Sequence, residues 1–151
     1  MRILLMRHAE ASHGFPDSER PLSSYGVQSL SDRPLGLSSQ LQSVTDVLVS
    51  PYLRTRQTIE GLLPGVSYAQ SPLLTPDCSP DPVLDQLADY HQDACVLLVT
   101  HMPLVGTLMS RLVDGQRGQA YGFSPAQIAV LECDVPAAGL ATHVNTFSLN
   151  A

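Results

Sequence analysis

Three short apolar runs along the chain predict buried β-strands. Each run is aliphatic or β-branched and nearly continuous, and together they cover Arg2–Met6, Asp46–Ser50 and Cys95–Thr100. Continuous runs of this length are typical of strands covered on both faces, as in a parallel sheet that lies between helices. We therefore expect these three segments to form the core strands of one sheet.

The intervals between these strands show helical spacing. Val27, Leu30, Leu37 and Leu41 recur as on one helix face, although Pro34 must kink or restart that helix. Further helices are predicted at Tyr52–Leu63, Pro82–Tyr90 and Leu104–Val113, a loop at 71–82, and later strands suited to an edge hairpin at Ile128–Cys133 and Thr142–Leu149. The alternation of strand and helix predicts an α/β sandwich, with a mostly parallel central sheet flanked by helices.

Length and composition narrow the class of protein. A chain of 151 residues suits a single domain over residues 1–151. No apolar stretch approaches the roughly 18 residues of a membrane span, and the N-terminus lacks a secretory signal, so we expect a cytoplasmic protein that does not bind membranes. A formal net charge of −6 disfavours nucleic-acid binding. Neither the three cysteines nor the histidines show metal-ligand spacing, so we expect no metal site and no cofactor.

Basic side chains follow the ends of the three predicted core strands. Arg7 and His8 come after the first strand, Arg54 falls in the first turn of the helix after the second, and His101 follows the third. In open α/β sheets, ligands bind outside the carboxyl ends of the strands. All eight basic residues of the chain are arginines, which suit planar, bidentate contact with phosphate. We therefore expect these side chains to meet at one edge of the sheet.

These residue types together predict phosphoryl transfer. A neutral imidazole at His8 can attack phosphorus, and a covalent step divides one difficult transfer into two easier ones. A cation at a helix N-terminus is locally unfavourable, so Arg54 suggests an anionic ligand there. His101, in its protonated form, can donate a hydrogen bond to a phosphoryl oxygen. Taken singly, each has an ordinary explanation, such as a histidine at a strand end or a surface arginine.

Five short motifs, in this order, make the sequence similar to a known family. They are Met6–Ala11, Arg20–Ser23, Val49–Arg54, Gln57-Thr58 and Val99–Gly106. The chain resembles the histidine phosphatase superfamily, in its phosphoglycerate mutase-like branch, and within it the short SixA-type bacterial phosphohistidine phosphatases. The resemblance implies a phosphoglycerate mutase-like three-layer sandwich without a large lid insertion.

The resemblance also implies roles for individual residues. His8 would take the phosphoryl group, while Arg7, Arg54 and His101 would hold its oxygens. Arg20 matches an arginine that approaches the same pocket in short members. The sequence departs from the family pattern at Ala9, where glycine is common. Thr55 likewise replaces a common alanine, and neither change removes a chemical group.

Three functions are compatible with these motifs: a phosphohistidine phosphatase acting on a protein, a small-metabolite phosphomonoesterase, and a non-catalytic phosphate-binding module. The complete set of nucleophile and phosphate-binding residues disfavours the third. Metabolite enzymes of this branch carry a covering insertion between the segments that hold Thr58 and His101, and here that interval is short. Asp17, Asp77 and Asp81 are candidate general acids, none convincingly positioned. We therefore expect a phosphohistidine-bearing protein as substrate, either a phosphotransfer domain of a histidine kinase or a phosphocarrier of the sugar phosphotransferase system.

Overall fold

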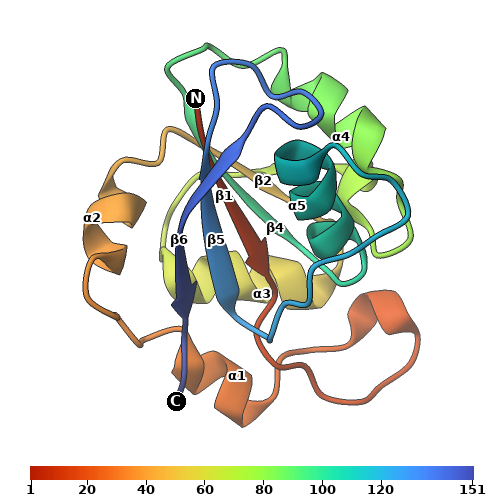
Figure 1. Cartoon of the computed structure of the whole chain (residues 1–151). Coiled ribbons are helices and arrows are strands. Elements are labelled where there is room, and N and C mark those ends of the chain that lie inside the picture. The colour runs from red at the N-terminus through yellow and green to blue at the C-terminus, as the bar shows by residue number, and fades with distance from the viewer.

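The computed structural model describes residues 1–151 and contains one six-stranded mixed sheet with helices on both faces (Figure 1). The strands are β1 (Arg2–Arg7), β2 (Asp46–Val49), β3 (Ala69–Gln70), β4 (Cys95–Thr100), β5 (Gln127–Glu132) and β6 (Thr142–Ser148). The α-helices are α1 (Ser24–Ser29), α2 (Leu37–Gln42), α3 (Leu53–Leu62), α4 (Pro80–Leu87) and α5 (Leu104–Asp114). Two short 3₁₀ helices, η1 (Asp17–Glu19) and η2 (Pro72–Leu74), lie in the loops.

The strand order is β3-β2-β4-β1-β5-β6, and the first four strands of that order run parallel. The three predicted core strands are therefore confirmed as neighbours. The predicted later strands also form, as an antiparallel pair with β6 at the sheet edge, while β5 lies inside because it also pairs with β1. No helix is both long and apolar enough to cross a membrane.

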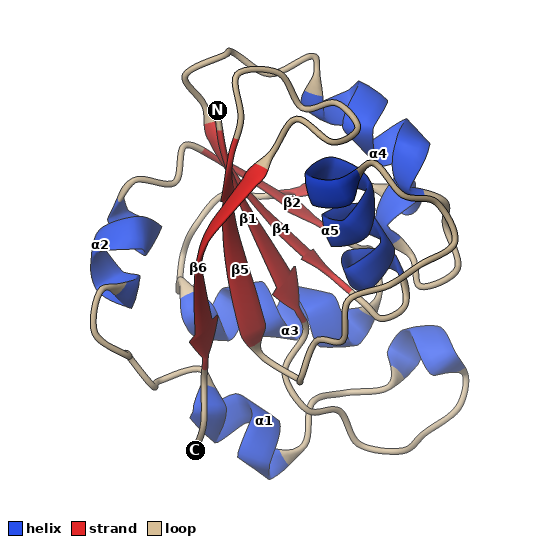
Figure 2. Cartoon of the chain, in the orientation of Figure 1, coloured by secondary structure: helices blue, strands red, loops and turns tan.

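Two hydrophobic clusters, one on each face of the sheet, explain why the core strands are apolar throughout. In β1, Ile3 and Leu5 belong to the cluster beneath α4 and α5, whereas Leu4 and Met6 belong to the cluster beneath α2 and α3 (Figure 2). Successive side chains of a strand point to opposite faces, so a strand covered on both sides needs an apolar residue at every position. Replacing one such leucine by alanine typically costs ~2–5 kcal/mol.

The helix predicted from the spacing of Val27 to Leu41 is two short helices. The chain leaves α1 after Ser29 and enters α2 at Leu37, with Pro34 in the interval and Gly36 in the left-handed region at φ 92°. One helix face therefore does not continue through both helices, and Val27 is 56% exposed. The other three residues of that spacing, Leu30, Leu37 and Leu41, are buried, and the restart expected at Pro34 is observed.

The buried face of α1 contains a glycine, Gly26. Gly26 is buried against the main chain, where an added Cβ would overlap the carbonyl oxygen of Glu10. Ser23 caps this helix, since its side chain accepts a hydrogen bond from the Gly26 amide and donates one to the Glu10 carboxylate at 2.7 Å. These contacts hold α1 against the segment that follows β1.

Candidate active site

The carboxyl ends of β1, β2 and β4 meet at one edge of the sheet, as expected. Arg7, the last residue of β1, pairs in register with Thr100, the last residue of β4. His8 and His101 follow these paired residues, so the two imidazole rings lie side by side with centroids 5.3 Å apart. The parallel register itself therefore brings the two histidines together.

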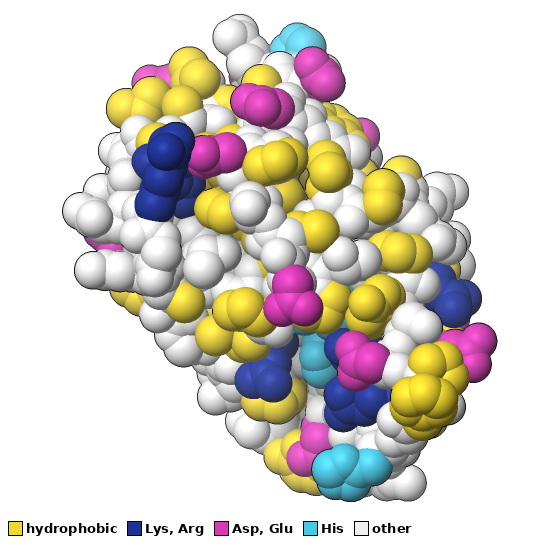
Figure 3. Space-filling view, turned by 90° about the vertical axis from the view of Figure 1, so that its right-hand side faces the viewer, with side chains coloured by type: hydrophobic (Ala, Val, Ile, Leu, Met, Phe, Trp, Pro, Cys, Tyr) yellow, Lys and Arg dark blue, Asp and Glu magenta, His cyan; other side chains and the backbone are white.

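The five residues predicted for the site line one cavity. This cavity, of about 260 Å³, is bordered by Arg7, His8, Arg20, Arg54 and His101. Figure 3 shows histidine and arginine side chains gathered in a hollow of the surface, with hydrophobic and acidic side chains around it. Sequence reasoning did not assign Glu10, Ala11, Met102 and Pro125, which complete the lining. The first three are sequence neighbours of the motif histidines, whereas Pro125 comes from a distant loop and had no local signal.

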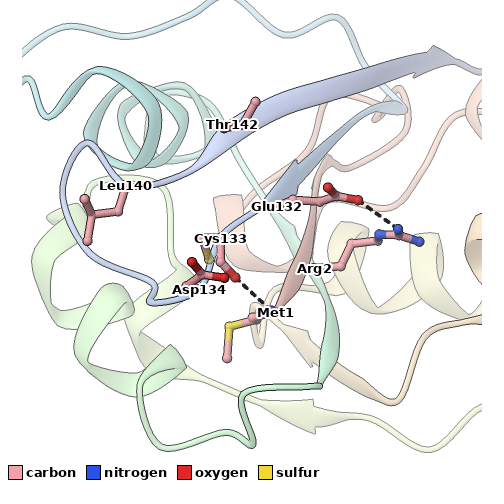
Figure 4. Close-up of a pocket in the computed structure, with 7 residues that line it drawn as sticks. All are labelled: Met1, Arg2, Glu132, Cys133, Asp134, Leu140 and Thr142. Carbon is pink, nitrogen blue, oxygen red and sulfur yellow. Dashed lines mark hydrogen bonds and ion pairs between the residues drawn. The ribbon is translucent and has the colours of Figure 1, made fainter.

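A larger cavity, of about 420 Å³, lies at the other end of the sheet (Figure 4). Its positive groups are already paired: the Met1 amino group donates to the carbonyl oxygen of Cys133 at 2.8 Å, and Arg2 pairs with Glu132 at 2.8 Å. It contains neither a histidine nor an unpaired arginine. The residues that could carry out phosphoryl transfer therefore line the smaller cavity.

The main chain fixes the tautomer of His8. Its Nδ1 lies 2.6 Å from the carbonyl oxygen of Ala9, which can only accept a hydrogen bond. Nδ1 must therefore carry the proton, and Nε2 keeps its lone pair. Burial lowers the pKa of His8 to about 4. The hydrogen bond to Ala9 raises this pKa by less than burial lowers it, and the charges of the nearby arginines lower it further. At neutral pH, His8 is an uncharged imidazole with a free Nε2.

His101 is also an uncharged imidazole at neutral pH. Burial lowers its pKa to about 2, and the positive charges around it act in the same direction. The imidazolium expected from the sequence is therefore disfavoured here, because no buried carboxylate compensates its charge. Nε2 of His101 lies 2.8 Å from Oγ of Ser50, and Nδ1 is buried without a partner in the protein. A neutral imidazole still has one N–H to donate.

Two arginines of the cavity keep unpaired donors. Arg54 is buried in the first turn of α3, and Arg7 donates from Nη1 to the carbonyl oxygen of Phe123 at 2.7 Å. The Nε groups of both arginines are buried and unpartnered. Burial, and then the charge of Arg54, lowers the pKa of Arg7. An anion between the two guanidinium groups would satisfy the donors and relieve this repulsion.

Asp17, outside the lining of the cavity, is the counter-ion of two of its arginines. Its carboxylate accepts hydrogen bonds from Arg20 at 3.0 Å and from Arg54 at 3.2 Å, and its carbonyl oxygen accepts a third from Arg54 at 2.6 Å. The hydrogen bond from Arg20, followed by that from Arg54, lowers the pKa of Asp17. An ionised carboxylate has no proton to give at neutral pH, so Asp17 is a poor general acid. Its spacing of three residues from Arg20 was the sequence signal for this pairing.

The other two candidate acids lie outside the cavity. Asp77 and Asp81 border a separate depression beside Pro103. Asp81 is held there by Arg111 at 2.8 Å and by Arg117 at 2.9 Å. Neither carboxylate faces His8, which agrees with the sequence-based judgement that neither was convincingly positioned.

Side chains of α3 connect the motifs to one another. Thr58 accepts a hydrogen bond from the Ala9 amide at 3.1 Å, and Gln57 accepts one from the Leu22 amide at 2.8 Å. Thr55 donates to the carbonyl oxygen of Ser50 at 2.8 Å. Ala9 is not among the residues with positive φ, so the alanine found in place of glycine causes no backbone strain.

No group of three or more histidine, cysteine, aspartate or glutamate side chains is arranged to hold a metal ion. The positive groups of the cavity are three arginines. Chemically, the arrangement offers one free imidazole lone pair next to cationic donors that suit a tetrahedral oxyanion.

Comparison with known proteins agrees with this chemistry. No protein-family model matches the chain. The phosphohistidine phosphatase SixA of Escherichia coli strain K12 is 32% identical over 123 residues, which cover 77% of this chain and 76% of that protein. A SixA homologue of Haemophilus influenzae is 30% identical over 148 residues, or 89% of each chain.

Structural comparison gives the same relatives. A solved structure of the protein histidine phosphatase SixA complexed with tungstate superposes with a TM-score of 0.82 and 31% identity, over 98% of this chain and 97% of that one. The agreement over nearly the whole length confirms the expected phosphoglycerate mutase-like fold without a large insertion.

Proposed function

The chain belongs to the SixA family of phosphohistidine phosphatases in the histidine phosphatase superfamily, and on that premise we propose that it hydrolyses phosphohistidine on another protein through a covalent intermediate at His8. The observation that carries the proposal is the state of His8. Its Nδ1 proton is held by Ala9, and its Nε2 lone pair is free beside the arginines of the cavity.

In the first step, Nε2 of His8 attacks the phosphorus atom of the substrate, and a new N–P bond forms as the N–P bond to the substrate imidazole breaks. The leaving imidazole takes a proton from solvent. In the second step, water attacks the phosphorus atom, the bond to His8 breaks, and inorganic phosphate leaves. The Ala9 carbonyl stabilises the positive charge that develops on the His8 ring, since it accepts from Nδ1 throughout.

The transferred group carries negative charge on its oxygens, and the cavity supplies donors for it. Arg7 and Arg54 would direct their unpaired Nε groups to these oxygens, and His101 would donate from its free ring nitrogen. Arg20 would approach from the loop, where Asp17 pairs with it in the ligand-free protein. Preorganised donors of this kind commonly contribute ~10²–10³ each to the rate. These roles follow from geometry and from the chemistry of phosphoryl transfer.

The surroundings of the cavity support a protein substrate. The segment between α3 and β4 forms β3 at the sheet edge, then η2 and α4, and none of its residues lines the cavity. That segment therefore leaves the cavity uncovered in this structure. Phe15, on the loop that also carries Asp17, is 97% exposed and offers an apolar contact to a docked partner.

For the partner we propose a protein that presents phosphohistidine on its surface, either a phosphotransfer domain of a histidine kinase or a phosphocarrier protein of the sugar phosphotransferase system. In both, the reacting group stands on a folded surface that could reach an open cavity. Cleavage of the P–N bond of phosphohistidine needs less help from a general acid than cleavage of a phosphate ester. This requirement fits a site in which Asp17, the carboxylate paired with Arg20 and Arg54, is ionised.

The test is a comparison of kcat/KM on a phosphorylated phosphotransfer domain with kcat/KM on phosphoglycerates and sugar phosphates, using one enzyme preparation. We expect the protein substrate to be preferred by at least tenfold. A metabolite preferred by tenfold or more would replace the proposal with a small-metabolite phosphomonoesterase that uses the same residues. Absence of turnover on every substrate, with oxyanion binding retained, would indicate the non-catalytic phosphate-binding module.

A further inference from the structure

Ser50 connects the end of β2 to the second histidine of the cavity. Its side chain is fully buried, and Oγ lies 2.8 Å from Nε2 of His101. The same oxygen accepts a hydrogen bond from the backbone amide of Tyr52 at 3.3 Å. Ser50 does not line the cavity, so it cannot touch a bound phosphoryl group itself.

The donors and acceptors around Ser50 determine whether Ser50 or His101 donates the hydrogen bond between them. A hydroxyl group has one hydrogen to donate and two lone pairs to accept with. The Tyr52 amide uses one lone pair, and Nε2 of His101 is the one acceptor within reach of the buried hydroxyl hydrogen. If His101 donated from Nε2 instead, the hydroxyl hydrogen would be buried without an acceptor, at a cost of about 1–3 kcal/mol. The hydroxyl of Ser50 therefore donates to Nε2.

The state of the other ring nitrogen follows from this hydrogen bond. A neutral imidazole with Nε2 as acceptor carries its proton on Nδ1. Nδ1 of His101 is buried and has no partner in the protein, while the His101 ring lines the cavity. In the opposite tautomer, Nδ1 would present a lone pair to a phosphoryl oxygen and repel it.

We propose that Ser50 is a positioning residue that fixes His101 as the Nδ1–H tautomer, so that this nitrogen donates to the phosphoryl group. The inference rests on the proposed function for the identity of the ligand, but not for the tautomer. This tautomer explains how two neutral histidines can have opposite roles, His8 as nucleophile and His101 as hydrogen-bond donor. Ala9, an acceptor at Nδ1 of His8, leaves a lone pair free at Nε2, whereas Ser50, a donor at Nε2 of His101, leaves an N–H free at Nδ1.

The tautomer can be measured directly by long-range ¹H–¹⁵N correlation spectra of ¹⁵N-histidine-labelled protein. For the wild type we expect a protonated Nδ1 at His101. In Ser50→Ala, the tautomer should move towards Nε2–H, and kcat should fall about tenfold, less than the ~10²–10³ expected when a donor is removed altogether. Ser50→Thr, which keeps the hydroxyl group, should retain the wild-type tautomer and most of the rate.

Two controls separate positioning from structural damage. The tautomer of His8 should stay unchanged in every Ser50 variant, because Ala9 accepts from its Nδ1. Ser29→Ala removes another buried hydroxyl, one that bonds the carbonyl oxygen of Gly26, and should alter neither the His101 tautomer nor kcat.

Two results would overturn the inference: a wild-type His101 protonated at Nε2, or an Nδ1–H tautomer that persists in Ser50→Ala. The first measurement needs no variant and so does not depend on the folding of Ser50→Ala. The wild-type tautomer is also independent of turnover. Loss of the proposed function would appear as absence of phosphohistidine hydrolysis by the wild type, a separate outcome.

Discussion

His8 and Ala9 are joined by a hydrogen bond of 2.6 Å, from Nδ1 of the imidazole to the carbonyl oxygen of the next residue. A hydrogen bond between adjacent residues needs no distant partner, so it persists when substrate arrives. It keeps the free lone pair on Nε2, where the register of β1 and β4 places the ring beside His101. The nucleophile is thus oriented before binding.

The first prediction is that His8 becomes phosphorylated during turnover. Brief incubation with a ³²P-labelled phosphohistidine protein should leave an acid-labile, base-stable label on His8, because a phosphoramidate resists base. His8→Ala should lose both the label and turnover. His91→Ala, which changes an exposed histidine far from the cavity, is the matched control and should behave as wild type. Near-normal turnover of His8→Ala would rule out the covalent mechanism.

The second prediction concerns pH. Because burial lowers the pKa of His8 from 6.5 to about 4, the native imidazole is neutral at pH 5.5, where a histidine with the ordinary value of ~6.5 would be about 90% protonated. The nucleophile is lost only as pH falls through about 4. An NMR titration of the His8 ring should show this midpoint in the ligand-free protein. A midpoint near 6.5 would mean that the ring is far more hydrated than its burial indicates.

The third prediction compares two arginines of the same helix. Arg54→Ala removes a buried guanidinium of the cavity and should lower kcat/KM by ~10²–10³, the usual effect of losing one preorganised donor. Arg56→Ala is the matched control, since Arg56 donates to the carbonyl oxygen of Pro51 and does not line the cavity. Its kcat/KM should stay within about twofold of wild type. A loss of less than tenfold for Arg54→Ala would show that its role is overstated.

The fourth prediction is that Asp17→Asn improves oxyanion binding. The carboxylate competes with an incoming anion for Arg20 and Arg54, and its pair with Arg20, at the surface, is worth up to about 1 kcal/mol. The inhibition constant of tungstate should therefore fall by up to about fivefold, while hydrolysis continues. Asp77→Asn, outside the cavity, should change neither value. Collapse of kcat in Asp17→Asn alone would instead identify Asp17 as a general acid.

The fifth prediction is that activity does not depend on a divalent metal. The arginines of the cavity supply the positive charge that Mg²⁺ supplies in many phosphoryl-transfer enzymes. Turnover of the phosphohistidine protein should survive dialysis against EDTA, measured beside an undialysed sample. Loss of turnover that one divalent ion specifically restores would contradict this expectation.

The sequence by itself determined the strands and the position of the chemistry. Continuous apolar runs such as Cys95–Thr100 are a local signal. Such a strand is apolar along its length because both of its faces are buried in the sheet. Arg7, His8, Arg54 and His101 each end or follow such a run or open the next helix, so their place at the sheet edge could be inferred from local pattern, whereas Arg20 lies in a loop. Pro34 marked the break between α1 and α2 in the sequence, but the left-handed conformation of Gly36 at the start of α2 was not foreseen.

Only the tertiary structure decided the protonation and hydrogen bonding within the cavity. Ser50 and His101 are 51 positions apart, and Asp17 and Arg54 are 37 apart, so no local pattern relates them. Burial, which lowers the pKa of both histidines, depends on everything packed around the cavity and not on the neighbouring residues alone. The sequence could therefore name His101 as a candidate donor, but only the fold shows that burial lowers its pKa.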